Sequence, residues 1–344
     1  MFNYLVRRVL TMIPMFLLMT AAYFAVQNYL PGGPVQEVLS RIQYGGGEGV
    51  GRTMSIEDVA KLKAELEHQY GLDQPVPVRY FKWLKKVTVL DFGDSLTTRE
   101  PAIQTIRERL PVSLGFAIPG FILTYVVCIL LGLYKAVKDG SRIDVHSSIL
   151  LFIAYSIPPL VLSVVFLLLF CTNRVLPGGA LFPLGGARSD HFDELSAFGQ
   201  FLDFAHHMFL PVVASLLGGF TMLTLLMKNS LLDVLGSDFI RTARAKGLSE
   251  KSVIFKHALR NAILPLMVGL GGYLSSFVAG SIIIESVFGL PGMGRLMLES
   301  LTSRDYNVLM AVAVIQSGIV MLGQLISDIA YVLIDPRIDF GGRD

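Results

Sequence analysis

The residues that come nearest to a phosphate-binding motif in this 344-residue chain form a short glycine-rich stretch. Gly46 and Gly51, followed by Arg52 and Thr53, differ by one residue from the phosphate-binding loop G-x-x-x-x-G-K-[ST]. Arginine replaces the lysine that would reach the phosphates, and no apolar strand precedes the loop. The pattern therefore predicts a flexible turn rather than a nucleotide site.

The adjacent histidines and the two cysteines do not indicate a metal site or a disulfide. His206 and His207 are adjacent, and adjacent residues do not share a helix face, so we expect an interfacial role and no metal site. Cys128 and Cys171 lie inside or at the edge of apolar runs, which predicts small core residues without a disulfide framework. With no Ser/His or metal constellation, we expect no catalytic residue and no cofactor.

The longest basic segment between two apolar runs covers residues 238–265. Phe239, Ala243 and Gly247 recur at i, i+4 and i+8, which predicts a short helix with a slim stripe of small residues. Arg241 and Arg244 fall on another face. Gly247 predicts the end of this helix, because glycine takes positive φ without a Cβ clash.

A second short helix is expected directly after this glycine. Ser249 can cap it, and Glu250 is favourable in its first turn. The segment therefore predicts helix, break and helix at a membrane surface, with Pro265 opening the next apolar run. The expected apolar side of the second helix is Phe255, Leu259 and Ala262, and its charged side is Lys256 and Arg260.

The letters RTARAKGLSEKS and KHALRNAILP resemble the cytoplasmic signature loop of ABC importer permeases, in the form found in oligopeptide and dipeptide permeases. Arg241 and Thr242 depart from the Glu-Ala of the wider family, and the interval from Gly247 to Pro265 is longer. The peptide-transporter form shares both departures. Taken alone, the same charges also fit a basic cytoplasmic loop without a partner.

In that family the loop is a coupling helix that docks into a groove on the ATPase subunit. The resemblance therefore implies a coupling role for one run of residues and implies no substrate contacts. The residues of this ATPase-coupling loop are Arg241, Thr242, Ala243, Arg244, Ala245, Lys246 and Gly247.

Further segments extend the resemblance over nearly the whole chain: YLVRRVLTMIP, GLDQP, DFGDS, ESVFGLPGMG and DPRIDF. Five segments are most similar to B-type permeases of microcin C importers: GGPV near the start, DFGDSL, the SRIDVHSS turn, residues 221–233 and DPRIDF. The resemblance implies the ABC type I importer fold and peptide transport, with microcin C-like peptides as one cargo, by alternating access. It also implies a heterodimer with a second homologous permease, cytoplasmic ABC ATPase subunits or one fused double ATPase, and a periplasmic peptide-binding protein.

Composition supports an all-α, polytopic membrane protein. Hydrophobic residues make up 53% of the chain and charged residues 16%, outside the range of soluble domains. The net charge of +2 is too small to indicate a nucleic-acid partner. Pro158 and Pro159 predict a kink in the third apolar run. Six transmembrane helices are expected in the lipid bilayer at about 9–30, 114–135, 147–171, 208–227, 265–285 and 308–327.

The short loops indicate orientation. Arg7, Arg8, Lys135, Lys138 and Arg142 fall on the side that also carries the basic loop, and this side is cytoplasmic by the positive-inside rule. Both termini are then cytoplasmic in a bacterial inner membrane. The expected divisions are 1–30 (N-terminus and first span), 31–113 (periplasmic, ordered, docking the binding protein), 114–334 (transmembrane core with coupling loop 228–262) and 335–344 (cytoplasmic C-terminus).

No apolar run carries a carboxylate near its middle, since Glu285 and Asp328 lie at run ends. A proton-coupled secondary transporter usually needs an acidic relay inside the membrane. We therefore expect that a separate subunit hydrolyses ATP and that this chain is no enzyme. A transporter or channel that works alone, and a structural membrane scaffold, are the rival classes; purification with an ATPase partner separates them.

Overall fold

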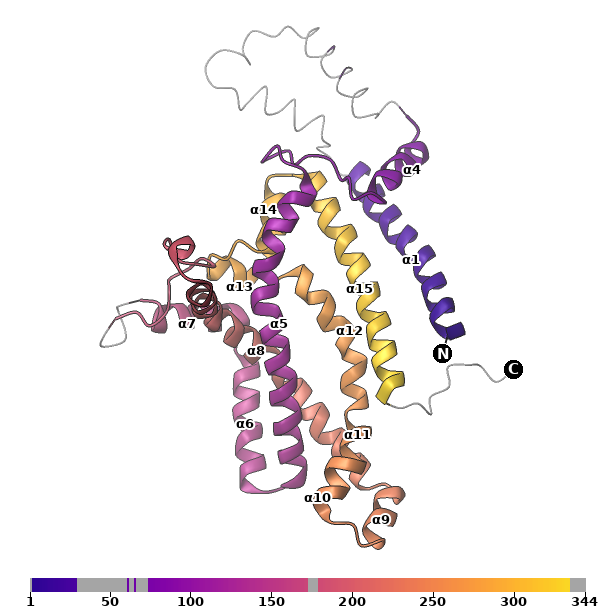
Figure 1. The fold of residues 1–344 in the computed structure, drawn as a ribbon, viewed down its shortest axis with the longest axis vertical. Helices are drawn as coiled ribbons and strands as arrows, with labels where there is room; N and C mark the ends of the chain where they lie inside the picture. The colour runs from indigo at the N-terminus through magenta and orange to yellow at the C-terminus, as the bar shows by residue number, and fades with distance from the viewer. Residues whose placement is uncertain (1, 30–60, 62–64, 66–73, 173–178, 335–344) are drawn as a thin grey trace. The chain divides into compact units, whose positions relative to one another are not determined.

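The computed structural model describes residues 2–29, 61, 65, 74–172 and 179–334 (Figure 1). The glycine-rich loop 45–51, most of the expected helix 56–70 and the tail 335–344 lie outside these residues. Within them the regular structure is helical, apart from one isolated bridge between Asp94 and Pro101.

The chain divides into two compact units. The first, here called the core unit, comprises Met1–Arg8, Arg109–Leu296 and Gly318–Asp344. The second unit comprises Val9–Glu108 and Met297–Ser317. The helices in chain order are α1 (Phe2–Tyr29), α4 (Val76–Val87), α5 (Ala102–Val137), α6 (Arg142–Ser156), α7 (Pro159–Phe170), η1 (Phe192–Glu194), α8 (Ala197–Leu235), α9 (Asp238–Ala245), α10 (Glu250–Ser252), the π-helix η2 (Val253–Ala258), α11 (Leu259–Ala262), α12 (Leu264–Ala279), α13 (Ile282–Val287), α14 (Met293–Thr302) and α15 (Tyr306–Ile334).

Among the described residues, five helices are long and apolar enough to cross a membrane, and a sixth span results if α6 and α7 count as one. Helices α5 and α8 begin earlier than the apolar runs predict, at Ala102 and Ala197, so residues expected in outer segments are helical. The five candidate membrane spans among the described residues are Val6–Val26, Ala102–Val137, Ala197–Leu217, Gly269–Val287 and Tyr306–Ala330.

The third apolar run contains a break that is much sharper than the kink expected at Pro158 and Pro159. Helices α6 and α7 are bent by 94° at Ile157 and Pro158, and both residues are extended. A residue before proline is pushed out of the helical region, and Pro159 occupies the first turn of α7, where its missing N–H leaves no donor unpaired. The proline pair thus ends one helix and starts another.

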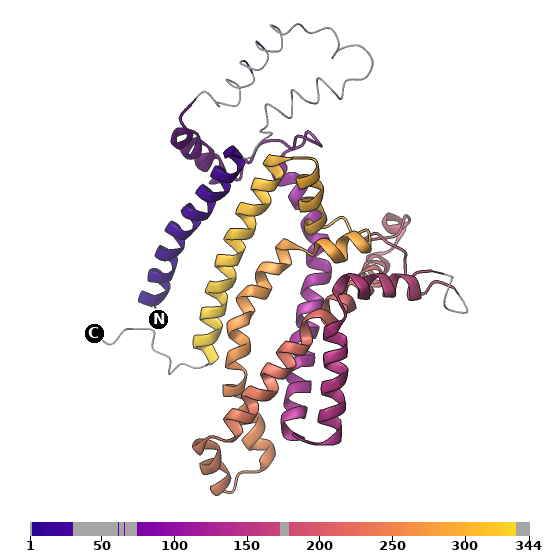
Figure 2. The ribbon, with the colours of Figure 1, turned by 180° about the vertical axis from the view of Figure 1, so that it is seen from behind.

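Two apolar clusters hold the core unit together. One joins α5 and α8 to the segment between α8 and α12, with Leu231, Ile240 and Val253 fully buried in it. The other lies around Phe116, Met208 and Phe288. The α5–α6 turn and the α9–α10 segment lie at the same end of the core unit, in both Figure 1 and Figure 2.

A buried carboxylate organises the turn between α13 and α14. Glu285 is fully buried, although the sequence places it only at the end of an apolar run. Its Oε1 accepts hydrogen bonds from Ser113 Oγ (2.8 Å) and the Ser281 N–H (3.1 Å), and its Oε2 accepts from the Arg295 N–H (2.8 Å). Ser113 Oγ also accepts from the Met293 N–H (2.7 Å), so side chains satisfy the backbone of this turn.

Asp305 has the same function in the second unit. Its Oδ2 accepts hydrogen bonds from Ser95 Oγ (2.5 Å) and the Thr97 N–H (3.2 Å). Asn307 Nδ2 donates to the Asp94 carbonyl (2.7 Å). These bonds fasten the DFGDS segment to the start of α15.

Helices α12 and α15 approach closely at a pair of glycines. A Cβ on Gly271 would lie 2.7 Å from the carbonyl oxygen of Gly323, whereas a Cβ on the adjacent Gly272 would meet nothing within 4 Å. Small residues permit this backbone contact between apolar helices.

We expect Gly271→Ala to destabilise the protein by about 1–3 kcal/mol, because the backbone of α15 must shift to admit the methyl group. Gly272→Ala is the matched control, and its effect should stay within about 0.5 kcal/mol. Thermal unfolding of the purified protein in detergent measures both. Equal melting temperatures for the two variants would contradict the close packing.

Candidate functional site

Helix α9 opens the predicted coupling loop, and one face of it is anchored in the core. Ile240 and Ala243 are buried in the same apolar cluster as Leu231 of α8. Within the expected stripe, Ala243 is buried whereas Phe239 is 46% exposed. Ile240 was missed as an anchor, although its i, i+3 spacing to Ala243 is the sequence signal that could have shown it.

Gly247 ends α9 as predicted. Its φ is +76°, and its N–H and that of Leu248 bond back to the carbonyls of Arg244 (2.9 Å) and Ala243 (3.4 Å). A Cβ at this position would meet nothing within 4 Å. The turn therefore needs glycine for its conformation and not for space.

The second helix starts as predicted and continues differently. Ser249 Oγ accepts from the Ser252 N–H (3.4 Å), and Glu250 stands in the first turn. The chain then forms the π-helix η2, in which the 3.6-residue period no longer marks the buried side. Phe255 is 52% exposed, contrary to the expected apolar side, while Ala262 is buried and Leu259 partly buried.

The two arginines of α9 pair within the loop. Arg244 reaches across the Gly247 turn to Glu250, with N–O distances of 2.6 and 3.1 Å. The hydrogen bond from Arg244 lowers the pKa of Glu250, and the bond to Glu250 raises the pKa of Arg244. Arg241 Nη1 lies 3.3 Å from Asp238 Oδ1. Thr242, Arg244, Ala245 and Lys246 are exposed with Arg241, away from Ala243.

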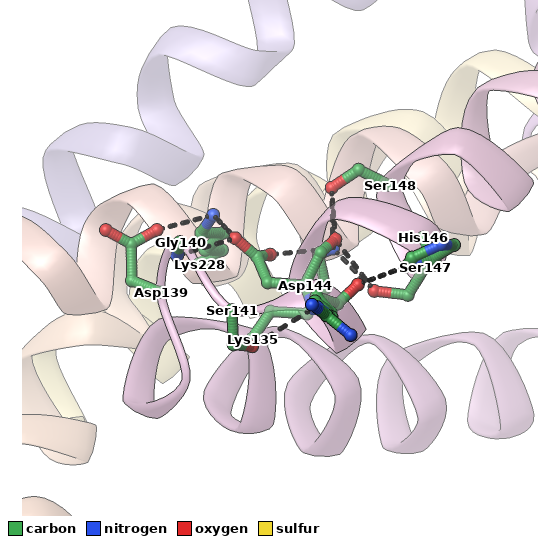
Figure 3. A network of polar contacts seen from close by, with 10 residues as sticks. Lys135, Asp139, Gly140, Ser141, Asp144, His146, Ser147, Ser148 and Lys228 are labelled. Carbon is green, nitrogen blue, oxygen red and sulfur yellow. Dashed lines mark hydrogen bonds and ion pairs between the residues drawn. The ribbon is translucent and has the colours of Figure 1, made fainter.

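A buried polar network joins α5, α6 and α8, and the sequence does not reveal it. Lys135 of α5 is fully buried. Its Nζ lies 2.9 Å from Asp144 Oδ1 and donates to the Asp144 carbonyl (2.8 Å), Ser147 Oγ (2.8 Å) and Ser148 Oγ (2.7 Å), as Figure 3 shows. This ammonium joins α5 to the first turn of α6.

Lys228 connects α8 to the same turn. Its Nζ lies 2.8 Å from Asp139 Oδ1 and 2.7 Å from Asp144 Oδ2 (Figure 3). Burial alone would lower the pKa of Lys228, but the hydrogen bonds to Asp139 and Asp144 raise it above its usual value. Because two lysines meet two aspartates, the four charges balance.

The described residues around the network do not form a candidate metal site. In the described part of the chain, no group of three His, Cys, Asp or Glu side chains could hold a metal ion. His206 Nε2 lies 2.9 Å from the Leu181 carbonyl oxygen, and His207 Nδ1 lies 2.8 Å from that of Asp203. The network joins α5, α6 and α8 through ion pairs and hydrogen bonds.

Comparison with known proteins places these features in a family. The family described as "Binding-protein-dependent transport system inner membrane component" matches residues 128–340. The inner membrane ABC transporter permease protein YejB of Escherichia coli O157:H7 is 39% identical, over 99% of both chains. The peptidoglycan transport system permease protein YejB of Agrobacterium fabrum is 36% identical over 99% of both, and the oligopeptide transport system permease protein AppB of Bacillus subtilis is 33% identical over 98% of this chain and 99% of its own.

We expect Lys135→Met to destabilise the protein by about 3–5 kcal/mol, because it leaves the buried Asp144 carboxylate without this cation. Lys138→Met is the matched control, since it removes one exposed positive charge from the same turn. Each substitution removes one positive charge from this region, so both change the charge that determines topology by the same amount. Thermal unfolding in detergent measures the difference, and similar melting temperatures would contradict the supporting role of Lys135.

Proposed function

This chain belongs to the binding-protein-dependent inner membrane components and is a multi-pass permease subunit of a peptide-type ABC importer, and we propose that residues 238–262 couple its transport cycle to a separate ATPase subunit. The permease itself is no enzyme. One observation carries the proposal: the loop has a rigid inner face and a partly apolar outer face. Ile240, Ala243 and Val253 are packed in the core, whereas Phe239, Leu248 and Phe255 are exposed.

The exposed side chains fit a docking surface for a protein. They lie between α8 and α12, outside the helices apolar enough to cross a membrane. Large apolar groups exposed to water beside charged ones mark interaction sites. Arg241 and Lys246 add positive charge to the rim. An ATPase subunit with an acidic-rimmed apolar groove fits this surface.

The remaining partners follow from the same assignment. We propose a second homologous permease as the other half of a heterodimer and a periplasmic peptide-binding protein that delivers the cargo. The names of two relatives give oligopeptide and peptidoglycan transport, which supports peptides, including murein-derived ones, as cargo. Microcin C-like peptides are a further candidate. Titration of the purified binding protein with each peptide class decides among them.

Both termini are proposed to face the cytoplasm. Arg8 Nε, near the start of α1, lies 2.9 Å from Asp328 Oδ2 in the last third of α15, which supports placing the two ends on one side. Lys228 ties the basic α5–α6 turn to α8, close to the coupling loop. An excess of Lys and Arg in short loops marks the cytoplasmic side.

Single cysteines test this topology. In a membrane-impermeant thiol assay on intact cells, Lys61→Cys should be labelled from outside, while Lys251→Cys should react only after the membrane is opened. The native Cys128 and Cys171 are buried and give little background. Labelling of both introduced cysteines in intact cells would contradict the proposed orientation.

The coupling role is tested at the Gly247 turn. Gly247→Val forces a β-branched residue into the left-handed region at a cost of about 1–2 kcal/mol, whereas Asn adopts this region readily. We expect Gly247→Val to insert normally but to lose uptake together with the ATP hydrolysis stimulated by loaded binding protein. Gly247→Asn should retain both.

ATPase activity and uptake are measured on the reconstituted complex, with and without loaded binding protein. Full stimulation of ATP hydrolysis with lost uptake in Gly247→Val would assign the loop to the translocation path instead. Ala243→Trp tests the buried face independently, because it enlarges a side chain packed against α8.

A further inference from the structure

Helix α4 carries positive charge and no negative charge. Its twelve residues include Arg79, Lys82, Lys85 and Lys86, and no aspartate or glutamate. Asp91 lies beyond its end, with Oδ2 3.8 Å from Lys86 Nζ. The helix thus presents an excess of cations that the coupling mechanism does not use.

The same helix is fastened to the carboxyl-terminal half of α1. Tyr80 Oη donates to the Leu17 carbonyl (3.0 Å), and the Phe24 ring lies 5.6 Å from the ring of Tyr80 and 5.5 Å from that of Trp83. The apolar stretch of α1 that could cross a membrane ends at Val26. Because Phe24 stands at that end, α4 lies at the depth of the membrane surface.

The face of α4 opposite to Tyr80 and Trp83 mixes apolar and basic side chains. Phe81 is 67% exposed, and Val78 is exposed beside it. Lys82 follows Val78 at i+4 and Lys85 follows Phe81 at i+4, so the pairs share one face. Lysines next to apolar groups can lie along a membrane boundary with their ammonium groups at the headgroups.

The residues after α4 continue this apolar edge. Val89 and Leu90 are 73% and 54% exposed. Leu90 has φ +58°, a conformation that is unusual for a residue with a bulky side chain. A leucine held in a strained turn and turned outward indicates that its side chain has a use at the surface.

We propose that α4 is an interfacial helix that binds the headgroups of anionic phospholipids at the carboxyl end of α1. The basic side chains contact the phosphates, while Phe81, Val89 and Leu90 enter the boundary of the acyl chains. An acidic protein surface would match the charges, but the depth fixed by Phe24 and the exposed apolar groups favour lipid. The proposal requires neither the coupling role of residues 238–262 nor a particular orientation.

Trp83 provides the measurement, because it is the single tryptophan of the chain and lies on α4. The full-length protein is reconstituted in phosphatidylcholine vesicles that contain equal mole fractions of either brominated phosphatidylglycerol or brominated phosphatidylcholine. We expect the brominated phosphatidylglycerol to quench Trp83 fluorescence more strongly. High salt should reduce the difference, since it screens exposed charges.

Lys82→Gln/Lys85→Gln should lower the preference for phosphatidylglycerol by at least about fivefold, the contribution of roughly one lysine at an anionic surface. Arg99→Gln/Arg107→Gln is the matched control, because it removes two exposed positive charges from the same unit. Equal quenching by both lipids in the wild type, or an unchanged preference in Lys82→Gln/Lys85→Gln, would overturn the proposal. A Trp83 response to the binding protein alone, with no lipid preference, would assign the surface to that protein.

Discussion

The cost of burying charge is the constraint on which the end of the core unit that carries the α5–α6 turn depends. Lys135 is fully buried. An ion removed from water loses several kcal/mol of solvation, and only close partners of opposite charge or polarity offset this loss. Asp144 supplies a carboxylate and a carbonyl, and Ser147 and Ser148 supply hydroxyls. These partners exist only when the first turn of α6 lies against α5. Lys228 extends the same condition to α8, so three helices are fixed at one end.

This fixed end gives a mechanical reason for the position of the coupling loop. Helix α9 begins shortly after α8 ends, and Ile240 is buried in the cluster that contains Leu231 and Met227 of α8. Under the proposed coupling role, a displacement of the loop would move α8, and Lys228 would transfer that displacement to α6. Beyond the proline pair, α7 continues from α6 at 94°. A path of packed elements thus leads from the loop to the other end of α6.

Local features of this site could be predicted from the sequence, and features that depend on packing could not. Gly247 and Ser249 were correct because a positive φ and a helix cap are decided within a few residues. The exposure of Phe255 was missed because a π-helix interrupts the period on which the prediction depended. The burial of Lys135 was missed because the positive-inside rule treats it like the exposed Lys138, and only the packed α5–α6 turn separates them.

The strength of the contacts differs between the two sides of the loop, and this difference suits a coupling element. On the inner side, Ile240 and Val253 are buried in the same apolar cluster as Leu231 of α8. Burying one such side chain is worth about 1.5–3 kcal/mol, so that side is held firmly against α8. On the outer side, Arg244 and Glu250 form an exposed pair, and solvent screening makes the contribution of such pairs to stability small. The turn can consequently adjust to a docked partner at little cost. Under the proposed coupling role, this combination would let the loop bind its partner through side chains and transmit displacement through its backbone.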